Sequence, residues 1–279
     1  MNPRIFALGS MLALAAALPA AAADLEPSQD AGPYVPSPVS VVSDMLKVAE
    51  LTSSDFIIDL GSGDGRIVLT AAKVFGARGF GVEIKDDLVK KANEAAKREG
   101  VADRVKFVRQ DLFKTDISPA TVVTMYLLPD TVNMLKDKFL TELKPGTRIV
   151  SHDYPLTGWI PEKYLQMDLE DKIQISGVTT TLIYLYIVPA KVAGKWEARM
   201  PPAIAKQPAS LTLKQQLTRV SGSLRLDGRD VPLEDVRLRG EHLSFRLVGH
   251  KGEFSGTVKD GAIDGMIDGK TPWSAAFRG

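Results

Sequence analysis

The segment Asp59-Leu60-Gly61-Ser62-Gly63-Asp64-Gly65-Arg66 decides the fold class of this chain of 279 residues. It joins the apolar run 55–60, typical of a short buried strand, to residues 66–75, whose pattern predicts a helix. Glycines at alternate positions let the backbone turn sharply and approach a ligand at the carboxyl end of the strand. A dinucleotide-binding turn, G-x-G-x-x-G, is incomplete because Arg66 stands at the last glycine position, and a P-loop is excluded because no Gly-Lys-Ser/Thr follows.

Strand and helix patterns alternate on both sides of this turn. This alternation favours an α/β domain over residues 39–190, with a doubly wound, mostly parallel sheet. Residues 24–38 are rich in proline and predict an extended lead-in. The predicted helices span 39–51, 66–75, 86–99 and 131–143, and the predicted strands span 55–60, 79–84, 104–108, 122–127, 148–151 and 179–188.

The pattern changes after residue 190. Residues 191–210 contain Pro201-Pro202 and Pro208, and we expect a linker there. Residues 211–279 alternate apolar and polar side chains over short stretches, which predicts a small antiparallel β barrel or sandwich. Trp196 and Trp273 are expected in its core. Turn signals separate the stretches at Asp227-Gly228, Asp260-Gly261 and Asp268-Gly269.

The composition excludes several classes of protein. A hydrophobic fraction of 44% with 25% charged residues is that of a soluble globular protein. With no cysteine, the chain cannot use disulfides, thiolate zinc sites or a cysteine nucleophile. The 35 basic and 34 acidic residues give no electrostatic case for nucleic acid, which we do not expect as a partner. His242 and His250 lack partners at metal-ligand spacing, so no metal site is predicted.

Residues 1–23 have the pattern of a secretory signal peptide. Arg4 precedes the apolar stretch 5–18, and Pro19 and Ala21-Ala22-Ala23 follow it. The stretch is short and rich in alanine, which disfavours a membrane span. We therefore predict cleavage after Ala23, export to the periplasm and no membrane span in the mature chain. A cytosolic ligand would be in tension with this destination.

Acidic residues at three successive strand ends indicate the ligand. Asp59 and Asp64 would repel a pyrophosphate and favour an amino group or a sulfonium. Glu83, about 20 residues after the glycine turn, is placed to accept both ribose hydroxyls of a nucleoside. Asp111 follows the third strand and could accept from an adenine amino group. An acidic residue at the end of one strand is more often a helix cap or part of a solvated turn. Together and in this order, the acidic residues indicate a ligand that is a nucleoside carrying a cationic group.

With these residues the chain resembles the class I S-adenosylmethionine-dependent methyltransferases over residues 34–188. Pro36-Ser37-Pro38, the glycine turn and Tyr126-Leu127-Leu128-Pro129 resemble the ATP synthase c-subunit lysine methyltransferase group, to which the β-rich C-terminal domain is an addition. The resemblance implies a seven-stranded Rossmann-like sheet and S-adenosylmethionine as cofactor. The residues implied to bind it are Asp59, Gly61, Ser62, Gly63, Asp64, Gly65, Arg66, Glu83, Asp111 and Leu112.

The methyl acceptor is indicated by the residues after the fourth strand. Related amino methyltransferases carry Asn/Asp-Pro-Pro-aromatic there, whereas this chain has Tyr126 and no amide, which disfavours glutamine and adenine acceptors. The resemblance implies a protein lysine. Its ammonium, with a pKa of about 10.4, must lose a proton at a cost of about 4 kcal/mol near neutral pH. An apolar mouth lowers that cost, and Leu127, Leu128 and Pro129 could form one.

Two tyrosines are further candidates. Tyr126 is predicted to be the catalytic residue, near the reacting methyl group, and the alternative is that it ends a buried strand. Tyr34 is predicted to fold over the site as a lid, and the alternative is an ordinary packed tyrosine. His152 and Asp153 follow the fifth strand, where alternation would place them on opposite faces, so they do not predict a relay.

Two other classes of function stay open. The chain could be an exported, non-catalytic nucleoside-binding protein, or a methyltransferase for a small molecule that the β domain holds. The acceptor is therefore a protein or a small molecule, and the sequence carries no signal for the oligomeric state.

Overall fold

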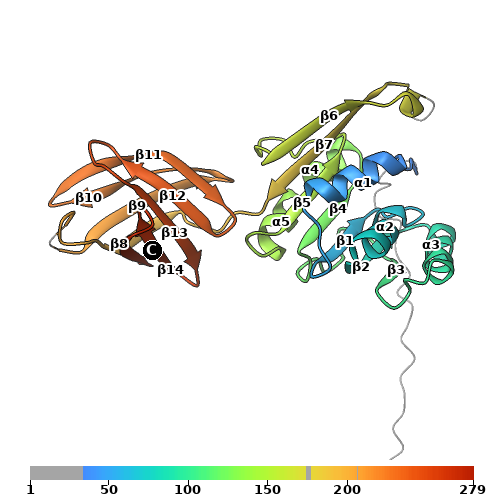
Figure 1. The fold of residues 1–279 in the computed structure, drawn as a ribbon, viewed down its shortest axis with the longest axis horizontal. Helices are drawn as coiled ribbons and strands as arrows, with labels where there is room; N and C mark the ends of the chain where they lie inside the picture. Colours follow the sequence, from blue (N-terminus) through green and yellow to red (C-terminus); the bar gives the residue numbers. More distant parts are fainter. Residues whose placement is uncertain (1–33, 174–176, 206) are drawn as a thin grey trace, which may run out of the picture.

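The computed structural model describes residues 34–173, 177–205 and 207–279, which form two units (Figure 1). The first is an α/β sheet that ends with Ile187, and the second is a closed barrel that begins with Gly194. The units touch where Arg239 Nε donates to Glu162 Oε1 at 2.8 Å. The predicted signal peptide, and residues 24–33 of the predicted lead-in, lie outside the described residues.

The first unit is a seven-stranded sheet in the order β3-β2-β1-β4-β5-β7-β6. Neighbours among β1 to β5 pair in parallel, and β7 is antiparallel to both of its neighbours. This confirms the doubly wound, mostly parallel sheet. The order of the chain reverses between β1 and β4, and ligands bind at the carboxyl ends of strands beside such a reversal. The strands are β1 (Phe56–Leu60), β2 (Arg78–Glu83), β3 (Val105–Arg109), β4 (Val122–Met125), β5 (Arg148–His152), β6 (Lys163–Asp168) and β7 (Thr180–Ile187).

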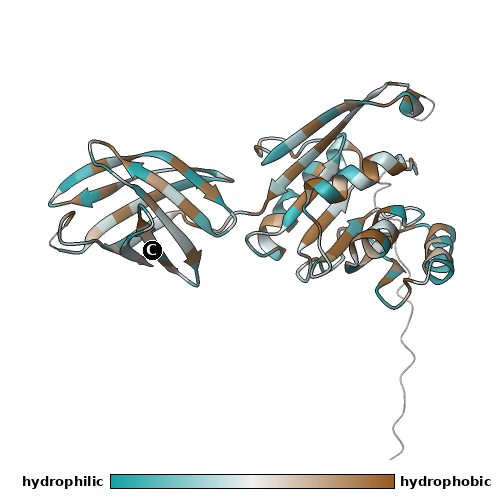
Figure 2. Cartoon of the chain, in the orientation of Figure 1, coloured by the Kyte–Doolittle hydropathy of each residue, from teal (hydrophilic) through white to brown (hydrophobic). Residues whose placement is uncertain are grey.

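Helices cover both faces of this sheet (Figure 1). Alternate residues of β1 point to opposite faces, so Ile57 joins one hydrophobic core and Ile58 the other. In Figure 2 the strands of the sheet are largely hydrophobic, and α3 carries a broad hydrophilic face toward solvent. One core contains α1 (Val39–Val48), α2 (Arg66–Phe75) and α3 (Asp86–Arg98), and the other contains α4 (Pro129–Met134) and α5 (Lys136–Glu142).

Strand β6 is absent from the elements that the sequence predicted. It is the edge strand and pairs only with β7. Its side chains are exposed except Met167, which is partly buried against one core, so the alternation of Leu165 and Met167 with polar residues is too short to mark a half-buried strand. The predicted helix 131–143 is divided at Leu135 into α4 and α5. The short 3₁₀ helix η1 (Glu170–Lys172) follows β6.

The second unit is a closed antiparallel barrel, which decides between the predicted barrel and sandwich. At all three Asp-Gly turns both residues have positive φ, for example 46° at Asp227 and 83° at Gly228. The first two are two-residue hairpin loops, which require this conformation, and Asp268-Gly269 lies in a three-residue loop. The strands are β8 (Gly194–Arg199), β9 (Ala209–Gln216), β10 (Arg219–Leu226), β11 (Arg229–Arg239), β12 (His242–Leu247), β13 (Glu253–Lys259), β14 (Ala262–Ile267) and β15 (Thr271–Phe277).

The barrel begins before the boundary at 211 that the sequence predicted. Strand β8 lies inside 191–210, where a linker was expected, and pairs with β9 and β15 to close the barrel. The prolines at 201, 202 and 208 fall between β8 and β9, so they mark a connection within the barrel.

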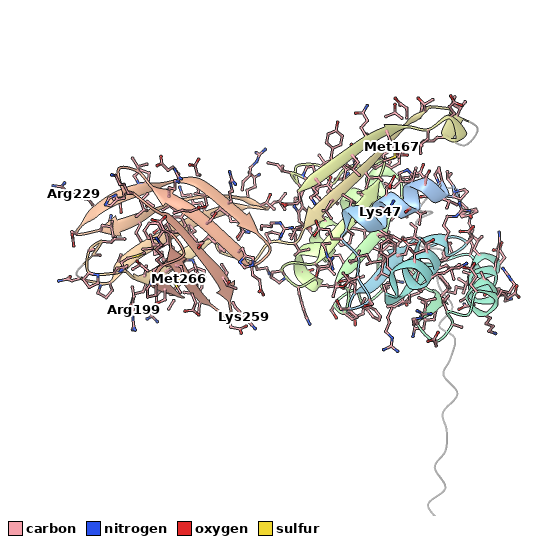
Figure 3. All side chains as sticks on the ribbon, viewed as in Figure 1. Lys47, Met167, Arg199, Arg229, Lys259 and Met266 are labelled. Carbon is pink, nitrogen blue, oxygen red and sulfur yellow. The ribbon has the colours of Figure 1, made fainter. Side chains whose placement is uncertain are left out.

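Large apolar side chains fill the interior of the barrel. Phe245 and Phe254 stack with ring centroids 5.0 Å apart, and Trp273 meets both rings edge-on. Trp196 and Trp273 are buried in this core, as the sequence predicted. Charged side chains such as Arg199, Arg229 and Lys259 point outward (Figure 3). Among the helices of the described residues, none is long and apolar enough to cross a membrane.

Candidate active site

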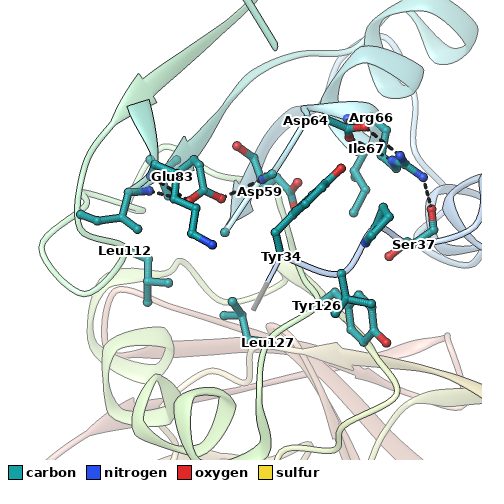
Figure 4. A pocket seen from close by; sticks show the side chains of 18 of the residues that line it. Tyr34, Ser37, Asp59, Asp64, Arg66, Ile67, Glu83, Leu112, Tyr126 and Leu127 are labelled. Carbon is teal, nitrogen blue, oxygen red and sulfur yellow. Dashed lines mark hydrogen bonds and ion pairs between the residues drawn. The ribbon is translucent and has the colours of Figure 1, made fainter. Parts of the chain in front are cut away.

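A pocket lies at the carboxyl ends of β1 and β2 and beside the segments that follow β3 and β4 (Figure 4). Its lining includes the glycine turn, Glu83, Asp111 and Tyr126, which come from four different strand ends. Parallel strands bring their carboxyl ends to one edge of the sheet. The fold therefore brings together the candidate residues that the sequence separates by almost 70 positions.

The glycine turn is held against β2 by its backbone. The amides of Gly61 and Ser62 both donate to the Val82 carbonyl, at 3.0 and 2.8 Å. A Cβ at Gly61 would lie 2.7 Å from Leu127 Cδ2, and one at Gly63 would lie 2.4 Å from Tyr34 Cε2. Both glycines also have positive φ, at 77° and 53°. Two other walls of the pocket can approach the turn only because these positions have no side chain.

Glu83, the last residue of β2, has a carboxylate that is fixed by backbone amides. Its Oε2 accepts from Gly63 N at 3.0 Å, and its Oε1 accepts from Ile84 N at 2.8 Å and from Lys85 N at 3.0 Å. A carboxylate offers about four acceptor positions. Glu83 can therefore still accept from a ligand's hydroxyl groups while its orientation is held.

Asp59 lies in β1 beneath the glycine turn and is 2% exposed. Its Oδ1 accepts from Thr124 Oγ1 of β4 at 2.7 Å. Burial raises the pKa of Asp59 to about 7, the carboxylates of Glu83 and Asp64 add to this shift, and the Thr124 hydrogen bond opposes it. A cationic group of a ligand in this pocket would favour the ionised form of Asp59.

Asp64 and Arg66 attach the N-terminal segment to the glycine turn. The Arg66 guanidinium donates to both Asp64 oxygens, from Nε at 2.9 Å and from Nη2 at 2.7 Å, and its Nη1 donates to the Ser37 carbonyl at 2.7 Å (Figure 4). Burial alone would raise the pKa of Asp64, but the Arg66 guanidinium holds it below its usual value. Tyr34 lies across the middle of the pocket, over Gly63.

Asp111 and Leu112 form the wall beyond β3. Asp111 is 5% exposed, and its Oδ1 accepts from Phe113 N at 2.9 Å in a local turn. Leu112 is buried beside it. A carboxylate held beside an apolar side chain is suited to a flat ring that carries an amino group.

Tyr126 and Leu127 follow β4 and form the opposite wall. The Tyr126 ring stacks on His152, with centroids 3.9 Å apart and planes at 34°. Its hydroxyl points away from Asp59 in Figure 4. Burial raises the pKa of Tyr126 well above its ordinary value, and the Asp153 carboxylate acts in the same direction. Tyr126 is therefore a neutral phenol whose ring, rather than a phenolate oxygen, borders the pocket.

Comparison with known proteins identifies the family. Residues 59–163 match the family model of the ANTKMT methyltransferase domain. A protein-lysine N-methyltransferase of Saccharolobus islandicus is 43% identical over 56% of this chain and 93% of its own length. The chain belongs to the S-adenosylmethionine-dependent methyltransferases. The resemblance to the ATP synthase c-subunit lysine methyltransferase group is confirmed as well: the Xenopus laevis enzyme is 35% identical over 47% of this chain and 57% of its own length.

A solved structure agrees with this methyltransferase assignment. The Salinibacter ruber protein, described as an RNA methyltransferase in complex with S-adenosyl-L-homocysteine, is 47% identical. It covers 57% of this chain and 96% of its own, with a TM-score of 0.51. The chain spans little more than half the length of the Xenopus laevis relative, and of the adenine nucleotide translocase lysine N-methyltransferase of Mus musculus, which is 36% identical.

The cofactor of this methyltransferase is S-adenosylmethionine, and the residues of the pocket fit it. Gly61 and Gly63 have no side chain, and a Cβ at either position would fill the space beside the turn. A ligand can therefore lie close to the backbone there. Glu83 would accept from the ribose hydroxyls, Asp111 would lie beside the adenine, and Asp59 and Asp64 supply negative charge for the amino group and sulfonium. The sequence placed all of these residues at the site.

Three predicted residues of the methyltransferase site lie outside the lining. Gly65 instead caps α2 with a φ of 84°. Pro129 is the first residue of α4, and Leu128 is 43% exposed. Because proline at the first position starts a helix, the chain turns away from the pocket after Leu127. The predicted apolar mouth is therefore limited to Leu127, beside the Tyr126 ring.

The structure also adds residues to the methyltransferase pocket. Ser37 lines it from the N-terminal segment, and Gln110 and Phe113 flank Asp111. Behind the wall, His152 lies with Nε2 3.6 Å from Asp153 Oδ1. The expectation that these two side chains face opposite sides is wrong, because Asp153 has a φ of 62° and ends the strand there. Strand alternation in the sequence could not reveal this turn.

Proposed function

We propose that this methyltransferase transfers a methyl group to the side-chain amine of a protein lysine. The observation that carries the proposal is the wall of Tyr126 and Leu127 beside the cofactor pocket, with no amide at the position of Tyr126. An apolar, aromatic wall suits an alkylamine better than an amide or a base that needs hydrogen bonds. Relatives named as protein-lysine N-methyltransferases support the same acceptor.

The mechanism needs alignment more than acid–base chemistry. Bound S-adenosylmethionine supplies an electrophilic methyl group, and the acceptor must present a free lone pair in line with it. Deprotonating a lysine costs about 4 kcal/mol near neutral pH, and burial against Leu127 and the Tyr126 ring reduces that cost by disfavouring the ammonium. Since its raised pKa keeps Tyr126 protonated near neutral pH, it has no phenolate to accept the lysine proton. We infer that Tyr126 acts as a wall that orients the amine.

Methyl transfer to lysine is tested with the full chain, tritiated cofactor and a cell-envelope extract. We expect a label that protease removes, and peptides whose lysines gain one or more methyl groups by mass spectrometry. Tyr126→Ala should reduce labelling at least about tenfold by misplacing the amine. Tyr164→Ala, an exposed tyrosine at the sheet edge, is the matched control and should label normally. A label that ribonuclease removes, or none in protein, would refute the lysine proposal.

We propose further that the chain is exported. The support is the pattern of residues 1–23, a charged start followed by an apolar stretch and small residues. We expect mass spectrometry of the protein from its native cell to find Asp24 at the N-terminus. Peptides that retain residues before Ala23 would contradict cleavage.

A further inference from the structure

A buried lysine and a largely buried aspartate lie behind the pocket wall, and the proposed mechanism does not use them. Lys172 of η1 has a side chain that is 3% exposed, and its Nζ donates to Asp153 Oδ1 at 2.7 Å and to the Thr180 carbonyl. Asp153 is fixed to β7 as well: its amide donates to the Leu182 carbonyl at 2.7 Å, and its Oδ1 accepts from Leu182 N at 3.1 Å. Hydrogen bonds therefore attach both members of the pair to the first residues of β7.

The backbone of Asp153 has the left-handed conformation, which aspartate adopts more readily than most residues. Its φ of 62° is uncommon for a residue other than glycine. This conformation brings its carboxylate next to the His152 ring, with 3.6 Å between Oδ1 and Nε2.

His152 connects the ion pair to the pocket. The ring is fully buried, its Nδ1 is hydrogen-bonded to Ser37 Oγ at 2.9 Å, and one face stacks on Tyr126. Burial lowers the pKa of His152 to about 4, so the ring is neutral. Ser37 and Tyr126 both line the pocket, whereas His152 and Asp153 lie behind it. Lys172, Asp153 and His152 thus lead in turn to the two pocket residues, and the step from Asp153 to His152 is a close charge–ring contact of 3.6 Å, longer than a hydrogen bond.

A buried ion pair is a poor means of stabilising a fold. Desolvation of the two charges offsets most of their attraction, and well-packed apolar residues are often equally stable. An ion pair can instead fix the positions of neighbouring side chains, since each of its two partners is held in one orientation. We infer that Asp153 and Lys172 are positioning residues for the methyl acceptor, which hold His152 and thereby the Tyr126 ring and Ser37 in place. The inference rests on the proposed function in placing the acceptor beside Tyr126.

The test compares two ion pairs at opposite ends of β5. The test variant, Asp153→Asn with Lys172→Met, removes both charges, and asparagine tolerates positive φ. The matched control, Asp55→Asn with Arg148→Met, removes the buried pair at the start of β5. We expect the test variant to bind S-adenosylhomocysteine within about twofold of wild type and to turn over about 10- to 100-fold more slowly, as misplacement of reacting groups does. The control should keep its turnover.

Nuclear magnetic resonance of the histidine side chains supplies a second measurement. The chain has three histidines, and His242 and His250 are exposed, so the buried His152 is readily assigned. Its protons should show an upfield ring-current shift from Tyr126, which the test variant should lose and the control should keep. If the double variant fails to fold, Asp153→Asn with Lys172→Gln, which leaves no uncompensated charge and keeps hydrogen-bonding groups, is measured in the same way.

Each outcome decides the inference. It is overturned if the folded variant keeps its turnover or its His152 signal, or if cofactor affinity falls as much as turnover, as a general structural defect would cause. If the wild type labels an acceptor other than lysine, the lysine proposal fails, and turnover on that acceptor still decides the positioning role. If the wild type labels nothing, a retained His152 signal refutes the inference and a lost one supports it.

Discussion

Replacing Glu83 by glutamine is expected to weaken S-adenosylmethionine binding about 30- to 1,000-fold, the equivalent of about 2–4 kcal/mol. In the variant, the ribose hydroxyls can no longer donate hydrogen bonds to a charged carboxylate. Each hydrogen bond of this kind contributes about 1.5–3 kcal/mol to binding. Titration calorimetry on the full chain measures the dissociation constant directly. The size of the effect follows from the contacts that already hold Glu83.

A glutamine side chain at position 83 has no orientation in which all three backbone amides keep their hydrogen-bond acceptors. One carboxylate oxygen of Glu83 accepts from Gly63 N and the other accepts from the amides of Ile84 and Lys85. Whichever way the amide turns, its NH₂ group meets a backbone N–H, and a donor then loses its acceptor. The substitution therefore removes a ribose acceptor and loosens the glycine turn at the same time.

Glu99→Gln is the matched control for the Glu83 variant. Glu99 caps α3 and pairs with Lys73 at 3.3 Å on the surface, and it does not line the pocket. Its cofactor affinity should stay within about twofold of wild type, because exposed pairs contribute little. Wild-type affinity in Glu83→Gln would show that Glu83 does not contact the ribose.

The cofactor side of the site could be predicted because its signals are local in sequence. Asp59, Glu83 and Asp111 each stand at or just after the end of a predicted strand, and a parallel sheet brings such positions to one edge. The glycine turn is equally local, since positive φ and close approach are properties of single positions. The order of the strands then brings the three segments that contain these residues to one pocket.

Elements without a strong hydropathy pattern could not be predicted. The apolar alternation in strand β6 covers only Leu165 and Met167, and of its side chains only Met167 is partly buried, against one core, so its pattern is too short to predict a strand. Strand β8 precedes Pro201-Pro202, which resemble a linker, and β15, the partner that closes the barrel on its other side, lies more than 70 residues further along the chain. Sheet edges and barrel closure depend on long-range pairing, which short-range patterns do not report.

The acceptor side was predicted only in part: Tyr126 and Leu127 line the pocket, but the residues behind them were missed for a similar reason. Lys172 reaches Asp153 across 19 positions, and His152 reaches Ser37 across 115. The turn at Asp153 that makes this cluster possible is a single backbone conformation. Leu128 and Pro129 were predicted to line the pocket as part of one apolar run, but the start of α4 separates them from Leu127.

Asp59 and Asp55, at opposite ends of β1, are expected to give opposite pH dependences of stability. The pKa of Asp59 is raised from 3.8 to about 7, chiefly by burial. The folded chain therefore binds a proton that the unfolded chain releases between about pH 4 and 7, and stability falls as the pH rises through this window. At 1.36 kcal/mol for each pH unit, the loss reaches about 4 kcal/mol above pH 7.

Asp59→Asn removes this loss, so its advantage in free energy of unfolding over wild type should increase from pH 4 to 7 and then level off. Urea denaturation across pH 2–9 measures the difference for both aspartates. Asp55 behaves in the opposite way: burial would raise its pKa, but hydrogen bonds from Thr121 and Thr52 and the Arg148 charge hold it below 3.8. Its contribution is present above that value and is lost as the pH falls further. Asp55→Asn should therefore be less stable than wild type at neutral pH, with a deficit that shrinks toward acid. Equal pH profiles for the two variants would show that the environment at the two ends of β1 does not set these charges.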